Sequence, residues 1–221
     1  MKLFFSLLFS YFLGAIPFGW ILSKLVKGVD IRKIGSGRTG TTNTMRASGY
    51  PIAILTLLLD GFKGVASVWL ARYIAPGMIG LEIMAPILAI VGHNYSIFLV
   101  EKDTTGKWIF KGGAGGATAL GATLALMPSA FPIISIIALI MFFAVGYASL
   151  ATLSIGASTL LLSVIQYLLG LSSWQYIVYG VLSTGLLVLA LLPNIARLKN
   201  GTERGVSWRS RKTIKLHLRK D

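Results

Sequence analysis

Long apolar windows constrain this chain more than any other feature. A helix of roughly 20 apolar residues is long enough to cross the hydrocarbon core of a bilayer. Five windows reach about that length, at residues 3–26, 51–75, 78–100, 131–152 and 174–195. Two shorter apolar windows, 117–127 and 153–170, bring the total to about seven segments. The sequence therefore predicts an all-α polytopic membrane protein with about seven transmembrane helices.

Composition agrees with this class. The 221 residues are 55% hydrophobic and 13% charged, and their mean hydropathy of +0.76 exceeds that of an average soluble domain. The first window follows Lys2, as a signal peptide would, but it contains Gly14 and Pro17 and runs into a basic loop, so we expect a retained helix. The chain has no cysteine, which excludes disulfides, thiolate nucleophiles and cysteine-based metal sites.

The distribution of positive charge predicts the orientation. The net charge of +14 is concentrated in three regions, which follow the first, third and last long windows. Their basic residues are Lys27, Arg32, Lys33, Arg38 and Arg46, then Lys102, Lys107 and Lys111, then Arg197, Lys199, Arg204 and those of the C-terminal tail. Loops rich in lysine and arginine stay in the cytoplasm. We therefore expect an outside N-terminus and a multi-pass protein of the cell (inner, cytoplasmic) membrane, with its active site on the cytoplasmic side.

We expect one transmembrane domain, residues 1–205, followed by a basic cytoplasmic tail, residues 206–221. Attraction to anionic headgroups, worth about 1 kcal/mol per basic residue, explains such a tail and makes membrane lipids its expected partner. Binding to nucleic acid is not expected, because Trp208 is the only aromatic residue in the tail and no folded recognition module surrounds it.

The first basic loop, DIRKIGSGRTGTTNTMRASG, has the composition of an anion site. Glycines such as Gly37 let backbone donors approach a ligand closely, and Ser36 and Asn43 add neutral hydrogen bonds. Arg46 offers a planar fork that suits phosphate, and the run TTNTMR would lead into an apolar helix whose N-terminus faces the anion. A flexible linker with a helix N-cap at Thr42 or Asn43 explains these residues equally well.

The second basic loop is glycine-rich and reads IFKGGAGGATALG, residues 109–121. Its candidate anion ligands are Lys111, Gly112, Gly113, Gly115 and Thr118. They precede an Ala/Leu segment, which favours a nest of backbone N–H groups at a helix N-terminus. The stretch does not match the Walker pattern, so nucleotide hydrolysis is not expected. Close helix packing is the alternative, and it explains Gly116 and Gly121 better than Lys111 and the double glycine.

The third region, LLPNIARLKNGTERG, places Asn194 and Arg197 one helical turn apart if the last helix continues past Pro193. Glu203 is the only acid in this region before the terminal Asp221. It is either a site residue or a solvated partner of a neighbouring arginine or lysine.

Two charges lie deeper in the membrane. Asp60 and Lys63 are three residues apart on one face of the second window, where they can form an ion pair. Charge at membrane depth marks a candidate functional site, although a purely structural ion pair is the alternative. His93 is a candidate base or ligand, or else a satisfied interfacial residue. Neither a second histidine nor an acidic cluster accompanies it, so no metal site is expected.

Six segments together resemble a known family. They are SYFLGAIPFGWILSK, DIRKIGSGRTGTTNTMRASG, LDGFKG, GHNYSIF, FKGGAGGATALG and NIARLKNGTE. Their order and spacing are similar to those of the bacterial integral-membrane acyl-phosphate:glycerol-3-phosphate acyltransferases. The resemblance implies seven helices, and transfer of an acyl group from acyl phosphate to the sn-1 hydroxyl of glycerol 3-phosphate in phospholipid biosynthesis. The products are lysophosphatidic acid and inorganic phosphate, and no metal or other cofactor is implied.

The resemblance also implies residue roles. Ser36, Arg46 and Asn194 match family positions that hold glycerol 3-phosphate and are our candidate catalytic residues. The glycine loop would hold the phosphoryl group of the acyl phosphate, and the acyl chain would lie between the helices. The remaining candidate substrate-binding residues are Gly37, Asn43, Asp60, Lys63, His93, Lys111, Gly112, Gly113, Gly115, Thr118, Arg197 and Glu203.

The chain departs from the family pattern at several positions. Ala114 stands where the family usually has a second lysine, Leu191 where it has a histidine, and Arg38 where it has an asparagine. The segment EKDTTGKWI looks like an insertion before the glycine loop. Either Arg38 or Lys107 would replace the lost charge, or the substrate differs. We expect a divergent acyltransferase, and a paralogue that binds lipid precursors without turnover is the alternative.

Two other classes of membrane protein fit less well. A CDP-alcohol phosphotransferase would also carry an intramembrane Asp-Gly pair, here Asp60 and Gly61, but its metal site needs several aspartates on neighbouring turns. A small-solute transporter would explain broken helices and intramembrane charges. It predicts symmetry-related segments in the two halves of the chain, and the sequence has no such internal repeat.

Overall fold

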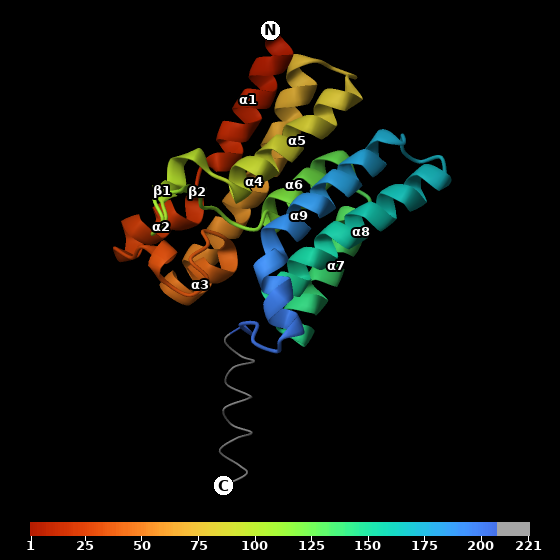
Figure 1. The fold of residues 1–221 in the computed structure, drawn as a ribbon. Helices are drawn as coiled ribbons and strands as arrows, with labels where there is room; N and C mark the ends of the chain where they lie inside the picture. The colour runs from red at the N-terminus through yellow and green to blue at the C-terminus, as the bar shows by residue number, and fades with distance from the viewer. Residues whose placement is uncertain (207–221) are drawn as a thin grey trace.

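The computed structural model describes residues 1–206, and this part of the chain is a helical bundle with one short β-hairpin at its side (Figure 1). Residues 207–221, most of the predicted basic tail, lie outside the described residues. The elements before the hairpin are α1 (Lys2–Ala15), α2 (Phe18–Lys27), the 3₁₀ turn η1 (Ile31–Lys33), α3 (Thr41–Ser48), α4 (Tyr50–Ile74), α5 (Ile79–Asn94) and the 3₁₀ turn η2 (Ile97–Leu99). The others are β1 (Val100–Lys102), β2 (Trp108–Phe110), α6 (Gly116–Leu126), α7 (Phe131–Ile140), the π-helical segment η3 (Met141–Val145), α8 (Ala148–Leu168) and α9 (Gln175–Lys199).

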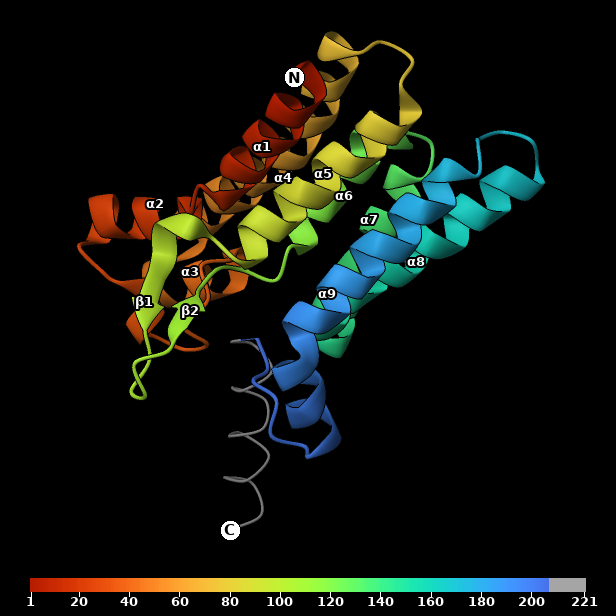
Figure 2. The same ribbon diagram turned by 45° about the horizontal axis from the view of Figure 1, so that its top comes forward.

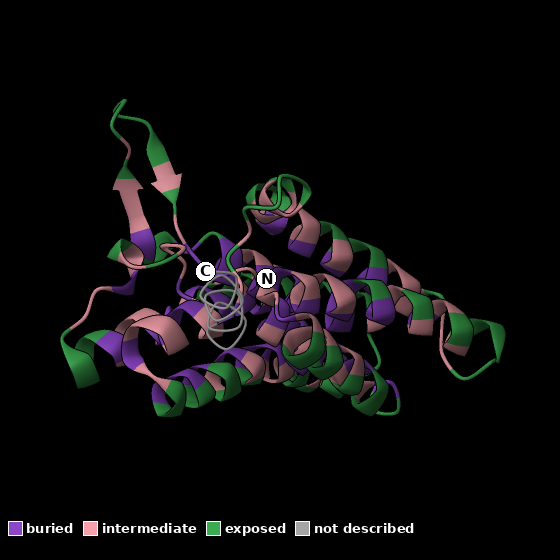
Figure 3. Ribbon diagram, turned by 90° about the horizontal axis from the view of Figure 1, so that it is seen from below, coloured by how far each residue is buried: buried purple, intermediate pink, exposed green. Residues whose placement is uncertain are grey.

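The helices confirm the membrane character of the chain. Five helical stretches are long and apolar enough to cross a bilayer, namely Lys2–Lys27, Tyr50–Ile74, Ile79–Leu99, Ala148–Leu168 and Gln175–Lys199. Two shorter apolar stretches, Gly116–Leu126 and Phe131–Val145, lie among them. Large apolar side chains cover the outer faces of the helices, as in Phe4, Leu58 and Ile136, which are 64%, 63% and 57% exposed. Figure 3 shows buried stretches on the sides of the helices that face other helices, and exposed stretches on the outer sides and in the loops.

Helices are interrupted inside two of the predicted apolar windows. The window 3–26 is not one helix, because Pro17 has no N–H group to continue the ladder; α1 stops at Ala15 and α2 leaves it at a steep angle (Figure 2). The window 131–152 is interrupted at Gly146, whose φ of +77° is easily reached only by glycine. Residues 148–152 therefore begin α8 and do not extend the preceding helix.

Glycines bring two helix pairs into close contact. A methyl group added at Gly92 of α5 would lie 2.2 Å from the carbonyl oxygen of Tyr11 in α1. One added at Gly121 of α6 would lie 1.9 Å from the carbonyl oxygen of Gly61 in α4. Small residues permit this approach and are typical of helix contacts inside membranes. The packing role predicted for Gly121 is confirmed.

The polar loops gather at one end of the bundle. α3, the hairpin and the C-terminal end of α9 lie away from the N-terminus, as Figures 1 and 2 both show. The hairpin pairs Glu101 with Ile109 in antiparallel register, so the segment that looked like an insertion forms β1, β2 and the turn between them. The three motif regions are therefore brought together although they lie far apart in the sequence.

Candidate active site

Asn43 shapes the loop that carries Ser36. Its buried side-chain Nδ2 donates to the carbonyl oxygens of Ile31, Ile34 and Arg38 at 2.9, 3.0 and 2.8 Å. Its Oδ1 accepts from the backbone N–H of Ser36 at 3.1 Å. The loop is therefore held in place from within, and the flexible-linker alternative with a cap at Thr42 or Asn43 is wrong, because the residue before α3 is Gly40.

The run TTNTMR also differs from its expected fold. It forms a separate eight-residue helix, α3, that ends at Gly49 and does not continue into an apolar helix. Gly49 has a φ of +90° and turns the chain into α4. Arg46 lies in the last turn of α3 and donates from Nη2 to the carbonyl oxygen of Gly205 at 3.1 Å.

The double glycine packs against the end of α5. The N–H of Gly113 donates to the carbonyl oxygen of His93 at 2.9 Å. A methyl group at Gly113 would lie 2.0 Å from Nε2 of His93, and one at Gly112 would lie 2.3 Å from the carbonyl oxygen of His93. Close packing therefore accounts for Gly112 and Gly113 as well as for Gly121, contrary to the expectation that it would not.

The start of α6 provides the backbone donors expected of an anion site. Gly115, with a φ of +80°, is the residue before the helix. The first N–H groups of a helix have no intrahelical acceptor and lie at the positive end of its dipole. Thr118 is fully buried inside this first turn. The N–H of Thr39 donates to the carbonyl oxygen of Gly112 at 3.2 Å, which joins this loop to the loop of Ser36.

The hairpin supplies an acid to the basic end of the glycine loop. Nζ of Lys111 forms an ion pair with Glu101 of β1. Oε2 of Glu101 lies 3.9 Å from Nη1 of Arg32, which is bound in turn to Asp30 at 2.7 Å. The hydrogen bond from the Arg32 side chain holds the pKa of Asp30 well below its usual range. The segment that looked like an insertion thus neutralises part of the charge beside the site.

α9 continues past Pro193 to Lys199, which is the condition under which the sequence places Asn194 and Arg197 one helical turn apart. Nδ2 of Asn194 donates to Oε1 of Glu203 at 2.7 Å, and Nε of Arg197 donates to Oε2 at 2.9 Å. Oγ of Ser149 donates to Oε1 at 3.2 Å. The side chain of Glu203 is only 5% exposed. It is a partner of Arg197, but the expectation that it is solvated is wrong.

The deep charges form the predicted ion pair. Nζ of Lys63 lies 2.7 Å from Oδ1 of Asp60, and both side chains are buried. Lys63 also donates to the carbonyl oxygens of Gly14, at 3.1 Å, and Ile16. These carbonyls lie at the end of α1, where the break at Pro17 removes the normal helical donors. Nδ1 of His93 lies 3.6 Å from Oδ1 of Asp60.

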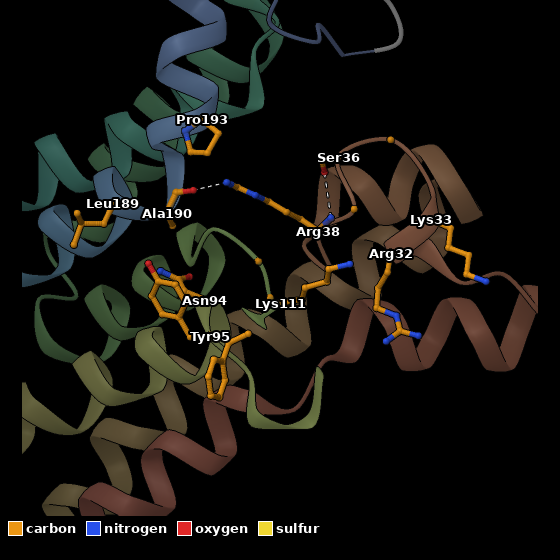
Figure 4. Close-up of a pocket in the computed structure, with 15 residues that line it drawn as sticks. Arg32, Lys33, Ser36, Arg38, Asn94, Tyr95, Lys111, Leu189, Ala190 and Pro193 are labelled. Carbon is orange, nitrogen blue, oxygen red and sulfur yellow. Dashed lines mark hydrogen bonds between the residues drawn. The ribbon is translucent and has the colours of Figure 1, made fainter. Parts of the chain in front are cut away.

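Two cavities meet at this end of the bundle. The first, of about 600 Å³, is polar and basic. It is lined by Arg32, Lys33, Gly35, Ser36, Gly37, Arg38, Asn94, Tyr95, Phe110, Lys111, Gly112, Gly113, Leu189, Ala190 and Pro193. Figure 4 shows Arg38 reaching across this cavity from the loop of Ser36 toward α9.

The second cavity, of about 500 Å³, is a mainly apolar groove between α4, α6, α7 and α8. Its walls include Ile54, Leu57, Leu120, Ser135, Ala138, Phe142 and Ile155. Its polar end includes Arg46, Asp60, His93, Gly115, Asn194, Glu203 and Arg204. Ser36 and Arg38 line both cavities, so the two are adjacent there.

The structure brings most predicted site residues to these cavities. Those on the walls are Ser36, Gly37, Asn43, Arg46, Asp60, His93, Lys111, Gly112, Gly113, Gly115, Asn194 and Glu203. Within the described chain, Lys63, Thr118 and Arg197 line neither of the two cavities. The apolar groove walls were not predicted individually, because an apolar residue facing the groove has the same sequence signal as one facing lipid.

Comparison with known proteins identifies the family. A family model described as glycerol-3-phosphate acyltransferase matches residues 4–201. The chain belongs to the glycerol-3-phosphate acyltransferase family. A family member of Syntrophomonas wolfei is 36% identical over 89% of this chain and 93% of its own length. One of Moorella thermoacetica, glycerol-3-phosphate acyltransferase 2, is 35% identical over 93% of this chain and 98% of its own length.

Solved structures of this family have the same fold. A crystal structure of PlsY (YgiH), described as an integral membrane glycerol 3-phosphate acyltransferase in its glycerol 3-phosphate form, is 31% identical, with a TM-score of 0.80. The match covers 93% of this chain and 96% of the other. The lysophosphatidic acid form of PlsY gives a TM-score of 0.79 at the same identity.

The buried ion pair of Lys63 leads to a stability prediction. In a Lys63→Met variant, Asp60 stays buried without a counter-charge and the carbonyls of α1 lose their donor. We expect the free energy of unfolding to fall by about 3–5 kcal/mol, the usual cost of leaving a buried charge unpaired. Thermal unfolding in detergent measures the loss. An Asp60→Asn/Lys63→Met double variant should recover part of it, and a double variant no more stable than the single one would contradict the role of the charge.

Proposed function

We propose that this protein transfers an acyl group from acyl phosphate to the sn-1 hydroxyl of glycerol 3-phosphate. The products are lysophosphatidic acid and inorganic phosphate, for use in phospholipid biosynthesis. The observation that carries the proposal is the junction of a basic cavity with an apolar groove at Ser36 and Arg38. One substrate is small, polar and anionic and the other has a long apolar chain, so a site for both needs such a junction. Membership of the family supports the same reaction.

The acyl phosphate lies in the apolar groove between the helices. Its chain packs between the helices against side chains such as Leu57, Leu120 and Ile155. Its phosphoryl group lies at the N-terminus of α6, where free N–H groups and the helix dipole favour an anion. Gly115 and Gly116 line the polar end of the groove at this point.

Glycerol 3-phosphate is held by Ser36, Arg46 and Asn194. Burial lowers the pKa of Arg46 from its usual value, yet a guanidinium remains charged in proteins and binds phosphate through its planar fork. Asn194 is oriented by its bond to Glu203, and its Oδ1 is buried without a hydrogen-bond partner in the described chain. That oxygen is available to accept a hydrogen bond from a glycerol hydroxyl.

Positioning and electrostatics carry the chemistry. The sn-1 oxygen attacks the acyl carbon, a new ester C–O bond forms, and the bond from that carbon to the phosphate oxygen breaks. The electron pair of the broken bond stays on the phosphate, and the hydroxyl proton ends on a phosphate oxygen. Because phosphate is a good leaving group and can take the proton, a strong protein base is not required. Cations and helix N–H groups stabilise the charge that develops on the phosphate.

The proposed reaction predicts a strong dependence on Arg46. Purified protein in detergent, given palmitoyl phosphate and glycerol 3-phosphate, should release lysophosphatidate and inorganic phosphate in equal amounts. Arg46→Gln removes charge-assisted hydrogen bonds worth about 1.5–3 kcal/mol, so kcat/KM for glycerol 3-phosphate should fall roughly 10- to 150-fold. Lys27→Gln, which removes one exposed charge from α2, is the matched control and should leave the rate unchanged.

Other outcomes of this assay would contradict the proposal. Phosphate release without lysophosphatidate would indicate a different acceptor. Absence of both products would favour a paralogue that binds without turnover, or one with another substrate. Movement of substrate across sealed vesicles without product would favour a transporter.

We further propose seven membrane crossings, with the N-terminus outside and the active site at the cytoplasmic face of the inner membrane. The clustering of the basic loops at one end of the bundle supports this orientation. The absence of native cysteine makes a direct test available. In intact cells, a membrane-impermeant thiol reagent should label Met78→Cys, at the start of α5, and spare Thr104→Cys, in the hairpin turn. The reverse pattern would contradict the orientation.

A further inference from the structure

Among the described residues, the side chain of Arg38 forms no ion pair. Its backbone is fixed, because its carbonyl accepts from Asn43 and its N–H contacts Oγ of Ser36 at 3.4 Å. Its side chain crosses to α9, where Nη2 donates to the carbonyl oxygen of Ala190 (Figure 4). Nη1 is buried and has no hydrogen-bond partner in the described chain. A buried charged donor without a partner is costly, which indicates that the site is built for a ligand that supplies one.

The part of the chain that the structure describes does not supply an anionic partner for Arg38. Within the described residues no carboxylate forms an ion pair with Arg38. Glu203 is close enough to act on it electrostatically but is already bound to Asn194 and Arg197, and Arg197 adds a like charge. An anionic ligand would relieve both the unpaired donor and the repulsion.

The other cations near the site are already bound to a partner, distant from the site, or, like Lys33, exposed and on the wall of the basic cavity alone. Lys111 is paired with Glu101, and Arg46 donates to the carbonyl oxygen of Gly205. Lys107 lies in the exposed turn of the hairpin and is on the wall of neither cavity. Arg38, by contrast, lines both cavities.

We propose that Arg38 binds the phosphoryl group of the acyl phosphate and stabilises it as it leaves, which makes Arg38 a catalytic residue. This inference rests on the proposed function. Of the residues that hold glycerol 3-phosphate, Ser36 lies with Arg38 where the two cavities meet, so the bond that breaks lies beside Arg38. As the bond from the acyl carbon to oxygen breaks, negative charge grows on that oxygen. A preorganised guanidinium donor at this place lowers the barrier because it is aimed where the charge develops.

The test compares Arg38→Gln with the wild type, with Arg38→Lys as the conservative variant and Lys27→Gln as the charge control. Turnover of palmitoyl phosphate should give a kcat for Arg38→Gln roughly 10- to 150-fold below wild type, the loss expected from charge-assisted hydrogen bonds. KM for glycerol 3-phosphate should change less than about twofold if those bonds go to the other substrate. Inhibition by inorganic phosphate, competitive with palmitoyl phosphate, should weaken about tenfold. Arg38→Lys should recover part of kcat because it restores the charge.

A second measurement does not depend on turnover. Inorganic phosphate should raise the unfolding temperature of the wild type and of Lys27→Gln in detergent, and should raise that of Arg38→Gln much less. If the wild type makes no lysophosphatidate but this dependence on Arg38 holds, the proposed function fails while the phosphate site stands. Equal stabilisation of wild type and Arg38→Gln by phosphate would overturn the inference. So would a rise in KM for glycerol 3-phosphate with kcat unchanged, which would assign Arg38 to the other substrate.

Discussion

The contacts of the Lys63 ammonium group hold together the end of the bundle that carries the site. Inside a membrane every backbone polar group must find a partner in the protein. At the break before Pro17 the N–H of Phe18 donates to Ile16, which leaves the carbonyl of Gly14 in α1 without its helical donor. Lys63 supplies it and is neutralised by Asp60. From there the contacts continue through His93 to Gly113, and from Gly112 to the loop that presents Ser36. A broken helix, a buried ion pair and two glycine loops thus form one connected framework.

This framework explains how the helices and loops of the described chain can join a water-soluble substrate to an apolar one in the proposed reaction. The loops close a basic cavity at the end of the bundle, while the space between α4, α6, α7 and α8 remains open to an acyl chain. Because both substrates of the proposed reaction carry phosphate, the site needs several cations and backbone donors but few groups that exchange protons. Asn43 holds the backbone of Ser36 in place by a hydrogen bond. Glu203 likewise holds the side chains of Asn194 and Arg197.

Predictions that rest on residue spacing within a single helix are confirmed by the structure. The three-residue spacing of Asp60 and Lys63 and the single turn between Asn194 and Arg197 depend only on helix geometry, and the structure confirms both. Contacts between distant segments were not predictable in this way. The packing of Gly113 on His93 and the reach of Arg38 to α9 depend on where separate helices end. The interruption at Gly146 was hidden because the residues on both sides are equally apolar.

The proposed site depends on the acyl chain lying in the groove between the helices. Ser135 of α7 lines that groove, whereas its neighbour Ile136 is 57% exposed on the outer face. The most direct measurement is kcat/KM for acyl phosphates of increasing chain length in Ser135→Phe, with Ile136→Phe as the matched control. A shift of the optimum toward shorter chains in Ser135→Phe alone, with KM for glycerol 3-phosphate unchanged, is the predicted result. An unchanged chain-length optimum in an active Ser135→Phe enzyme would contradict this placement of the acyl chain.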